Sequence, residues 1–167
     1  MKIISFNEFN CNLDLESIKF SLIQRENGAE WPLHKADELE IWYRRFLYLV
    51  GLYPEKAIVP SKDIDVFWHT HILDTQKYMA DCERLFGKYF HHFPYFGMRG
   101  GKDRSNLEEA FAETDKLFLR HFGESPLSSG IADCGSLCNE PTPKWNKNSL
   151  YSNQRPTLAD IGGLNLI

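Results

Sequence analysis

The sequence contains no run of the 18 to 20 or so apolar residues that a membrane-spanning helix requires. Its start, Met1-Lys-Ile-Ile-Ser-Phe-Asn, reaches a polar residue too early for the apolar core of a signal peptide. We therefore expect a cytoplasmic protein that does not associate with membranes. Cysteine is scarce, with four residues in the chain: Cys11, Cys82, Cys134 and Cys138. In a reducing compartment these are expected to be free thiols or metal ligands rather than a disulfide framework.

The chain also lacks a strong excess of either charge. It has 19 basic and 23 acidic residues, a net charge of −4 and an isoelectric point near 5.9. Such a mildly acidic chain has no global electrostatic footprint of a nucleic-acid-binding protein. Internal repeats and low-complexity tracts are absent as well. What is present, 43% hydrophobic and 25% charged residues in 167, is the balance of one globular domain with a sizeable core.

Apolar residues at helical spacing predict an all-α fold, a compact bundle of about four helices. The predicted helices cover about residues 13–25, 35–50, 61–86 and 105–122. Glycines follow the last three of them, which is the usual position of a glycine that ends a helix. Together they predict a helical domain over residues 1–123.

Residues 124–167 have a different character, because Ser, Gly, Pro and Asn dominate and apolar periodicity disappears. This composition predicts an extended or partly disordered tail, since it buries too little apolar surface to offset the entropy of ordering. Cys134 and Cys138 lie in the tail, separated by three residues, which is wider than the common zinc knuckle. They are interpreted as two exposed thiols, with soft metal ligands or a redox pair as the alternative.

The sequence from Asp65 to His71, Asp-Val-Phe-Trp-His-Thr-His, carries the clearest chemical signal. Residues two apart on an α-helix point about 200° apart, so His69 and His71 share an ion only if the helix is broken or distorted. Asp65 and His69 are four residues apart and lie on one face. They form either a surface ion pair or half of a metal site, in which the carboxylate binds the ion or orients the imidazole.

His71 lies instead on the apolar stripe of the predicted 61–86 helix, which also holds Phe67, Tyr78 and Cys82. It is interpreted either as a metal ligand or as a buried neutral imidazole that hydrogen-bonds to a neighbouring helix. In a straight helix Cys82 lies about 16 Å beyond His71, so the two cannot bind one ion. Cys82 is expected to behave as a small buried apolar residue.

Residues 89–101 hold five aromatic side chains, followed by glycines. The His91-His92 pair in this segment is the obvious source of a further metal ligand. Arg99 is predicted to bind an anionic ligand if the segment forms a lid or pocket wall. The segment can also fold back on the core or recognise another protein. Aromatic and basic residues together are a weak signal for single-stranded nucleic acid, which the acidic balance outweighs.

These residues resemble a known signature. Asp65, Trp68-His69-Thr70-His71, Tyr78, Asp81-Cys82, Gly87 and His92 resemble the glycine-rich domain-containing protein-like family, which occurs in plants and, as shorter proteins, in bacteria. The resemblance covers about residues 44–101. Because the tail has only isolated glycines, the chain resembles the short bacterial type without the glycine-rich extension. The resemblance implies that Asp65, His69, His71, Tyr78, Cys82 and His92 act together, but it implies no particular reaction.

Two classes of function follow. In the first, Asp65, His69, His71 and His92 bind a divalent transition metal, zinc or iron, for an enzyme in which Tyr78 or His71 moves protons. In the second, the histidines are structural and residues 89–101 recognise a protein. The partner is accordingly a small molecule or a protein, with nucleic acid disfavoured. Convergence of the histidines on one point favours the metal.

Overall fold

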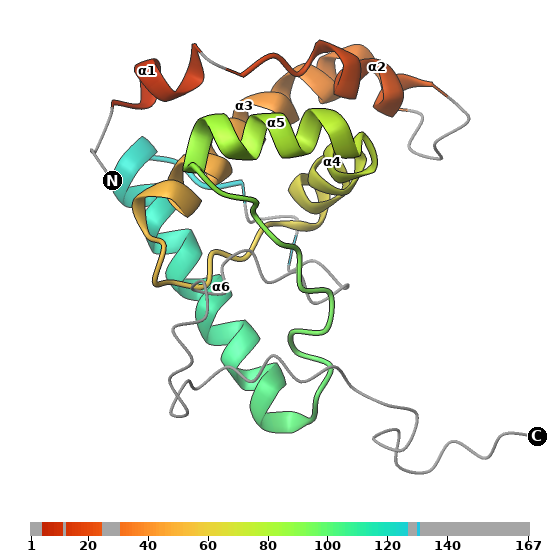
Figure 1. Ribbon diagram of the computed structural model, residues 1–167. Coiled ribbons are helices and arrows are strands. Elements are labelled where there is room, and N and C mark those ends of the chain that lie inside the picture. Colours follow the sequence, from red (N-terminus) through yellow and green to blue (C-terminus); the bar gives the residue numbers. More distant parts are fainter. Residues whose placement is uncertain (1–4, 12, 25–30, 127–129, 131–167) are drawn as a thin grey trace, which may run out of the picture.

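The computed structural model describes residues 5–11, 13–24, 31–126 and 130. Within these ranges the chain forms six helices and no β-strand, which confirms the all-α prediction (Figure 1). The helices are α1 (Phe6–Asn10), α2 (Glu16–Ile23), α3 (Leu33–Leu52), α4 (Lys62–Leu73), α5 (Thr75–Phe86) and α6 (Gly101–Phe122). None of them is long and apolar enough to span a membrane.

The prediction of one long helix over residues 61–86 is wrong, because the helix is interrupted at Asp74. The backbone of Asp74 leaves the helical conformation, with φ −81° and ψ 74°. Its carboxylate accepts a hydrogen bond from the backbone N–H of Lys77 at 3.3 Å and so caps the start of α5. Ser61 caps α4 in the same way, through the N–H of Ile64 at 3.4 Å. The interruption turns α5 back toward α4, and the apolar pattern alone does not reveal it.

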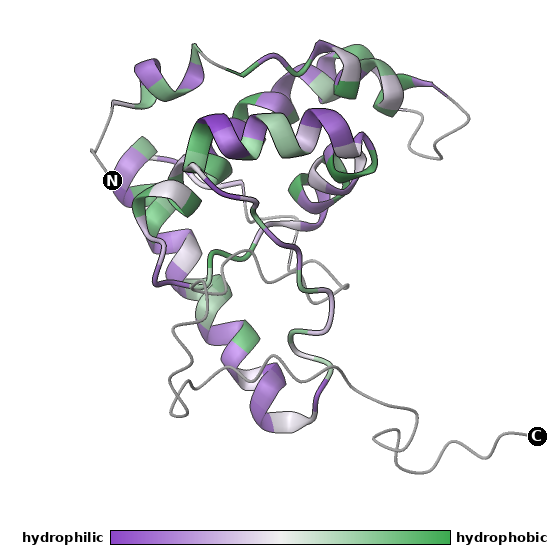
Figure 2. Ribbon diagram, in the orientation of Figure 1, coloured by the Kyte–Doolittle hydropathy of each residue, from purple (hydrophilic) through white to green (hydrophobic). Residues whose placement is uncertain are grey.

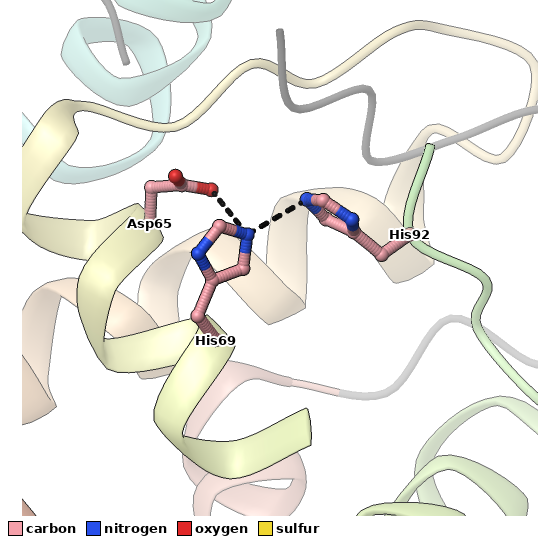
Figure 3. Close-up of side chains that lie close together, drawn as sticks. All are labelled: Asp65, His69 and His92. Atoms are coloured by element: carbon pink, nitrogen blue, oxygen red, sulfur yellow. Dashed lines mark hydrogen bonds and ion pairs between the residues drawn. The ribbon is translucent and has the colours of Figure 1, made fainter. Parts of the chain in front are cut away.

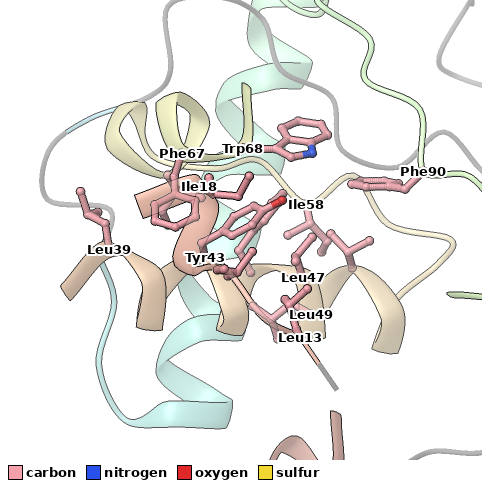
Figure 4. Packing of buried hydrophobic residues seen from close by; sticks show 14 of the residues in the cluster. Leu13, Ile18, Leu39, Tyr43, Leu47, Leu49, Ile58, Phe67, Trp68 and Phe90 are labelled. Carbon is pink, nitrogen blue, oxygen red and sulfur yellow. The ribbon is translucent and has the colours of Figure 1, made fainter. Parts of the chain in front are cut away.

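The hydrophobic core is built around α3, which contacts α1, α2, α4 and α6. Tyr43 of α3 is fully buried against Phe67 of α4 (Figure 4). Phe46 of α3 is fully buried against Trp68 of α4. Hydrophobic and hydrophilic positions are interspersed along the helices, as helices with one buried face require (Figure 2). Each fully buried large side chain of this kind stabilises the fold by about 1.5–3 kcal/mol.

Residues 87–100, here called the ligand loop, connect α5 to α6 and pack on a second, smaller core. This core consists of Val59, Phe93, Phe96, Leu107 and Ala110. Gly97 has φ +85°, and a Cβ there would lie 2.5 Å from Cδ2 of Leu107, so the close approach requires glycine. Asp103, in the first turn of α6, accepts hydrogen bonds from the backbone N–H groups of Gly97 at 2.7 Å and Arg99 at 3.1 Å. The end of the ligand loop is therefore fixed to α6.

Helix α6 begins at Gly101, four residues earlier than predicted, because the Asp103 bonds organise its first turn. The short helix α1 was not predicted, whereas α2 and α3 lie close to their predicted ranges. The predicted tail, 124–167, lies outside the described residues except for 124–126 and 130. Cys134 and Cys138 fall in that part of the chain, so the interpretation of these thiols stays a prediction.

Candidate metal centre

Asp65 and His69 lie one turn apart on α4, as their spacing predicts. Oδ1 of Asp65 is 3.6 Å from Nε2 of His69. The side chain of Asp65 is buried, at 3% exposure, while that of His69 is 38% exposed. The pair therefore extends from the protein interior to the surface, with the carboxylate at the inner end.

The ligand loop brings His92 to the same place. Nε2 of His92 lies 2.9 Å from Nε2 of His69, and the two rings are nearly perpendicular, at 78°. Figure 3 shows that both interactions meet at one ring nitrogen of His69. One ligand atom from each of Asp65, His69 and His92 lies within 4.8 Å of the other two. We call these three residues the metal triad.

The spacing of the metal triad suits a small transition-metal ion. Two nitrogens bound at about 2.0–2.1 Å to one ion, at bond angles of about 90–110°, lie about 2.8–3.4 Å apart. The His69–His92 separation of 2.9 Å falls in this range, and the Asp65–His69 separation of 3.6 Å is slightly longer. Imidazole with carboxylate is a donor set of zinc and iron sites, whereas calcium and magnesium prefer oxygen donors.

The electrostatic state of His92 also suits a ligand. Burial lowers the pKa of His92 from its ordinary 6.5 to about 4; His69 acts in the same direction and Asp65 opposes it. The His92 imidazole is therefore neutral at pH 7, the form in which histidine binds a metal. Without an ion, one Nε2–H donates a hydrogen bond to the other Nε2 across the 2.9 Å contact.

His71 was predicted as a ligand, but the structure does not bring it into the metal triad. It is 1% exposed and holds hydrogen bonds at both ring nitrogens, from the hydroxyl of Tyr43 at 2.9 Å and to Oδ2 of Asp81 at 3.1 Å. Lys77 pairs with the same carboxylate oxygen at 2.8 Å. Burial lowers the pKa of His71 to about 4, so it is neutral at pH 7. This burial and the bond to Tyr43 of α3 agree with the alternative interpretation, a buried neutral imidazole bonded to a neighbouring helix.

Tyr78, predicted to move protons, is buried, and its hydroxyl both accepts and donates a hydrogen bond. It accepts a hydrogen bond from Nε1–H of Trp68 at 3.0 Å and donates one to the backbone carbonyl of Phe90 at 2.7 Å. Burial raises the pKa of Tyr78, so that the hydroxyl holds its proton. These contacts give no support to the predicted role in proton transfer.

Arg99, predicted to bind an anionic ligand, is paired within the protein. Nη2 donates to Oδ1 of Asp103 at 2.8 Å and Nε donates to Oδ2 at 3.2 Å. The guanidinium also lies over the ring of Phe93, 5.0 Å from its centre. These contacts attach the ligand loop to α6, and they give the predicted anion-binding role no support.

The aromatic residues of the ligand loop face mainly inward. Phe90, Phe93 and Phe96 are buried, whereas Tyr89 is exposed and Tyr95 half-buried. The three phenylalanine rings are therefore part of the core and not of the exposed surface of the loop. The loop folds back on the core, which was one of the predicted alternatives.

Cys82 is a buried free thiol, as expected, and burial raises its pKa. The straight-helix distance used to separate it from His71 does not hold, because the helix is interrupted at Asp74. Sequence reasoning also missed the role of Asp81 as the partner of His71. The available signal was Asp74 itself, because aspartate favours helix N-caps over helix interiors.

Comparison with known proteins assigns the chain to a family. Residues 19–113, more than half of the chain, match the family model described as UCP032817-like, and the chain belongs to this family. It is 32% identical over 109 residues to glycine-rich domain-containing protein 1 of Arabidopsis thaliana, covering 62% of this chain and 13% of the relative. It is 32% identical over 132 residues to glycine-rich domain-containing protein 2 of the same plant, covering 75% of this chain and 16% of the relative.

These matches confirm the predicted resemblance to glycine-rich domain-containing proteins. The family match extends beyond the predicted range of 44–101 at both ends and includes part of α2 and of α6. The chain spans less than a fifth of either curated relative. No solved structure matches the chain.

Proposed function

We propose that the protein binds a divalent transition metal, zinc or iron, through Asp65, His69 and His92. The observation that carries the proposal is the convergence of these three side chains, although His69 on α4 and His92 in the ligand loop are 23 residues apart in the sequence. Two imidazoles and a carboxylate at this spacing can bind one ion with little rearrangement. Coordination would replace the short contact between the two Nε2 atoms with two bonds to the ion.

A three-residue ligand set leaves coordination positions for water or a substrate. An open position of this kind is typical of catalytic sites, whereas structural zinc sites are closed by four protein ligands. A metal in such a site supplies Lewis acidity and lowers the pKa of bound water to about 7. We propose that the open position lies on the exposed side of His69, opposite the buried carboxylate. We propose further that the protein is a metal-dependent enzyme that binds water or substrate at this position.

Metal content of untagged protein tests the proposal. Wild-type protein is expected to retain about one zinc or iron per chain by elemental analysis. His69→Ala and His92→Ala are expected to weaken zinc binding by about 10- to 100-fold or more, while keeping the helical circular dichroism spectrum. His91→Ala is the matched control, because His91 is exposed and lies outside the metal triad. Zinc affinity equal in all three variants and the wild type would refute the proposal.

A further inference from the structure

A chain of hydrogen bonds connects α4, α5 and the ligand loop beside the metal triad. The indole N–H of Trp68 donates to the hydroxyl of Tyr78, and that hydroxyl donates to the carbonyl of Phe90, at 3.0 and 2.7 Å. All three residues are buried. We call this chain the hydroxyl relay.

Both ends of the hydroxyl relay adjoin a residue of the metal triad. Trp68 directly precedes His69, and Phe90 is two residues before His92. The indole ring stacks on the ring of Phe90, with centres 5.3 Å apart, and meets the ring of His92 edge-on at 4.6 Å. The element that carries one imidazole is thus joined to the segment that carries the other.

We propose that Tyr78 is a positioning residue for the metal site, whose hydroxyl holds the ligand loop so that His92 faces His69. This inference rests on the proposed metal function. It adds to the site a residue that binds no metal itself but holds one of the metal ligands in place. The far end of the ligand loop is fixed by Asp103, and the loop begins with the left-handed turn at Gly87. Between these points, the Tyr78–Phe90 bond fixes the backbone two residues before His92.

The energetic reason is the burial of the Phe90 carbonyl. A buried carbonyl without a hydrogen-bond donor is unfavourable, so loss of the Tyr78 hydroxyl lets the loop shift toward another donor or toward water. A ligand that moves by a few tenths of an ångström no longer matches the short distances of an imidazole–metal bond. Partners that orient metal ligands affect affinity by about 10- to 100-fold when they are removed.

Tyr78→Phe tests the inference because it removes the hydroxyl and keeps the ring. We expect zinc binding, measured by competition with a chelator, to weaken by about tenfold or more. Tyr43→Phe is the matched control: Tyr43 is equally buried, and its hydroxyl bonds His71 outside the metal triad. Both variants are expected to lower the Tm of the metal-free protein by similar amounts, but Tyr43→Phe should change zinc affinity less than twofold.

A double-mutant comparison shows whether Tyr78 acts through His92. In a His92→Ala background, Tyr78→Phe is expected to have no further effect on zinc affinity. An equally large effect in that background would overturn the inference. The inference would also be overturned if His92→Ala weakened zinc binding while Tyr78→Phe and Tyr43→Phe had the same effect on zinc affinity. If His69→Ala and His92→Ala are themselves without effect, the proposed metal function fails instead.

A second variant covers the case in which Tyr78→Phe does not fold. Trp68→Phe removes the indole N–H that donates to Tyr78 and keeps an aromatic ring in the core. It is expected to weaken zinc binding several-fold, because the hydroxyl loses the donor that orients it toward Phe90. Zinc affinity of Trp68→Phe equal to that of the wild type would overturn the inference.

Discussion

His71 on α4 and Asp81 on α5 share a buried hydrogen bond of 3.1 Å, although ten residues separate them. In one straight helix, residues ten apart lie about 15 Å apart along the axis. The contact exists because Asp74 ends α4 and begins α5, which folds the second helix back onto the first. The same turn brings Tyr78 to Trp68 and allows the ligand loop to return past His69.

Replacing Asp74 with alanine is therefore expected to destabilise the turn between α4 and α5 and the contacts that depend on it. The substitution removes the carboxylate that accepts the N–H of Lys77, and loss of an N-cap costs about 0.5–2 kcal/mol. Urea unfolding followed by circular dichroism measures the change. Asp74→Asn, which can still cap, is the control and should retain most of the stability. An Asp74→Ala variant as stable as the wild type would contradict the assignment of the cap.

The stability of the ligand loop is expected to depend on pH, because Asp103 must be ionised to hold the loop. Burial opposes ionisation, but hydrogen bonds from the side chain and backbone of Arg99 outweigh it and hold the pKa of Asp103 below its ordinary value. A carboxyl whose pKa is depressed by folding contributes stability above its unfolded pKa, near 3.9. That contribution is lost as the pH falls through the folded pKa.

Asp103→Asn tests this dependence. The variant is expected to be about 1.5–3 kcal/mol less stable than the wild type at pH 7, because hydrogen bonds to a charged group are lost. The difference in free energy of unfolding between the two proteins should shrink as the pH is lowered from about 5 toward 2. A difference that stays constant over this range would show that Asp103 is not the group responsible.

How well the sequence predicted each contact of the site depends on how far apart the two residues are along the chain. Asp65 and His69 meet because residues four apart share a helix face, which is a local rule. His92 was predicted as a further ligand because the His91-His92 pair lies in the segment that follows the helix ended by Gly87. The partners of His71 were not predictable from the apolar stripe, since that stripe runs unbroken through the sequence while the backbone turns at Asp74.

Arg99 illustrates the same limit at the start of α6. Its pairing with Asp103 depends on where that helix begins, and the sequence predicted a start at 105 rather than 101. From the sequence, Arg99 was predicted to bind an anionic ligand rather than a carboxylate of the same chain. The four-residue spacing of Arg99 and Asp103 was present in the sequence, but Arg99 lies before α6, so the contact depends on the turn that precedes the helix and not on a shared helix face.

Gly97→Ala is expected to disturb both the fold and the ligand loop. The new Cβ would lie 2.5 Å from Cδ2 of Leu107, in addition to the strain of φ +85°. Gly100→Ala is the matched control, because it has φ +100° and no atom within 4 Å of the new Cβ. We expect Gly97→Ala to lower the free energy of unfolding by about 1–3 kcal/mol more than Gly100→Ala does. Equal losses in thermal unfolding would show that Leu107 moves aside freely.

The last prediction concerns Asp65 and the stabilisation of the fold by zinc. Zinc that binds the folded chain at one site raises the free energy of unfolding by about 2.7 kcal/mol at a free concentration 100 times the Kd. Asp65→Asn keeps the size of the side chain but loses the charge of the buried carboxylate, which is the innermost member of the metal triad. The variant is expected to unfold at nearly the same temperature whether zinc or a chelator is present. Wild type and His91→Ala should both show a zinc-dependent rise in Tm that the chelator reverses. If Asp65→Asn showed the same rise as the wild type, the carboxylate would have no part in binding the ion, and the two imidazoles would have to bind it without Asp65.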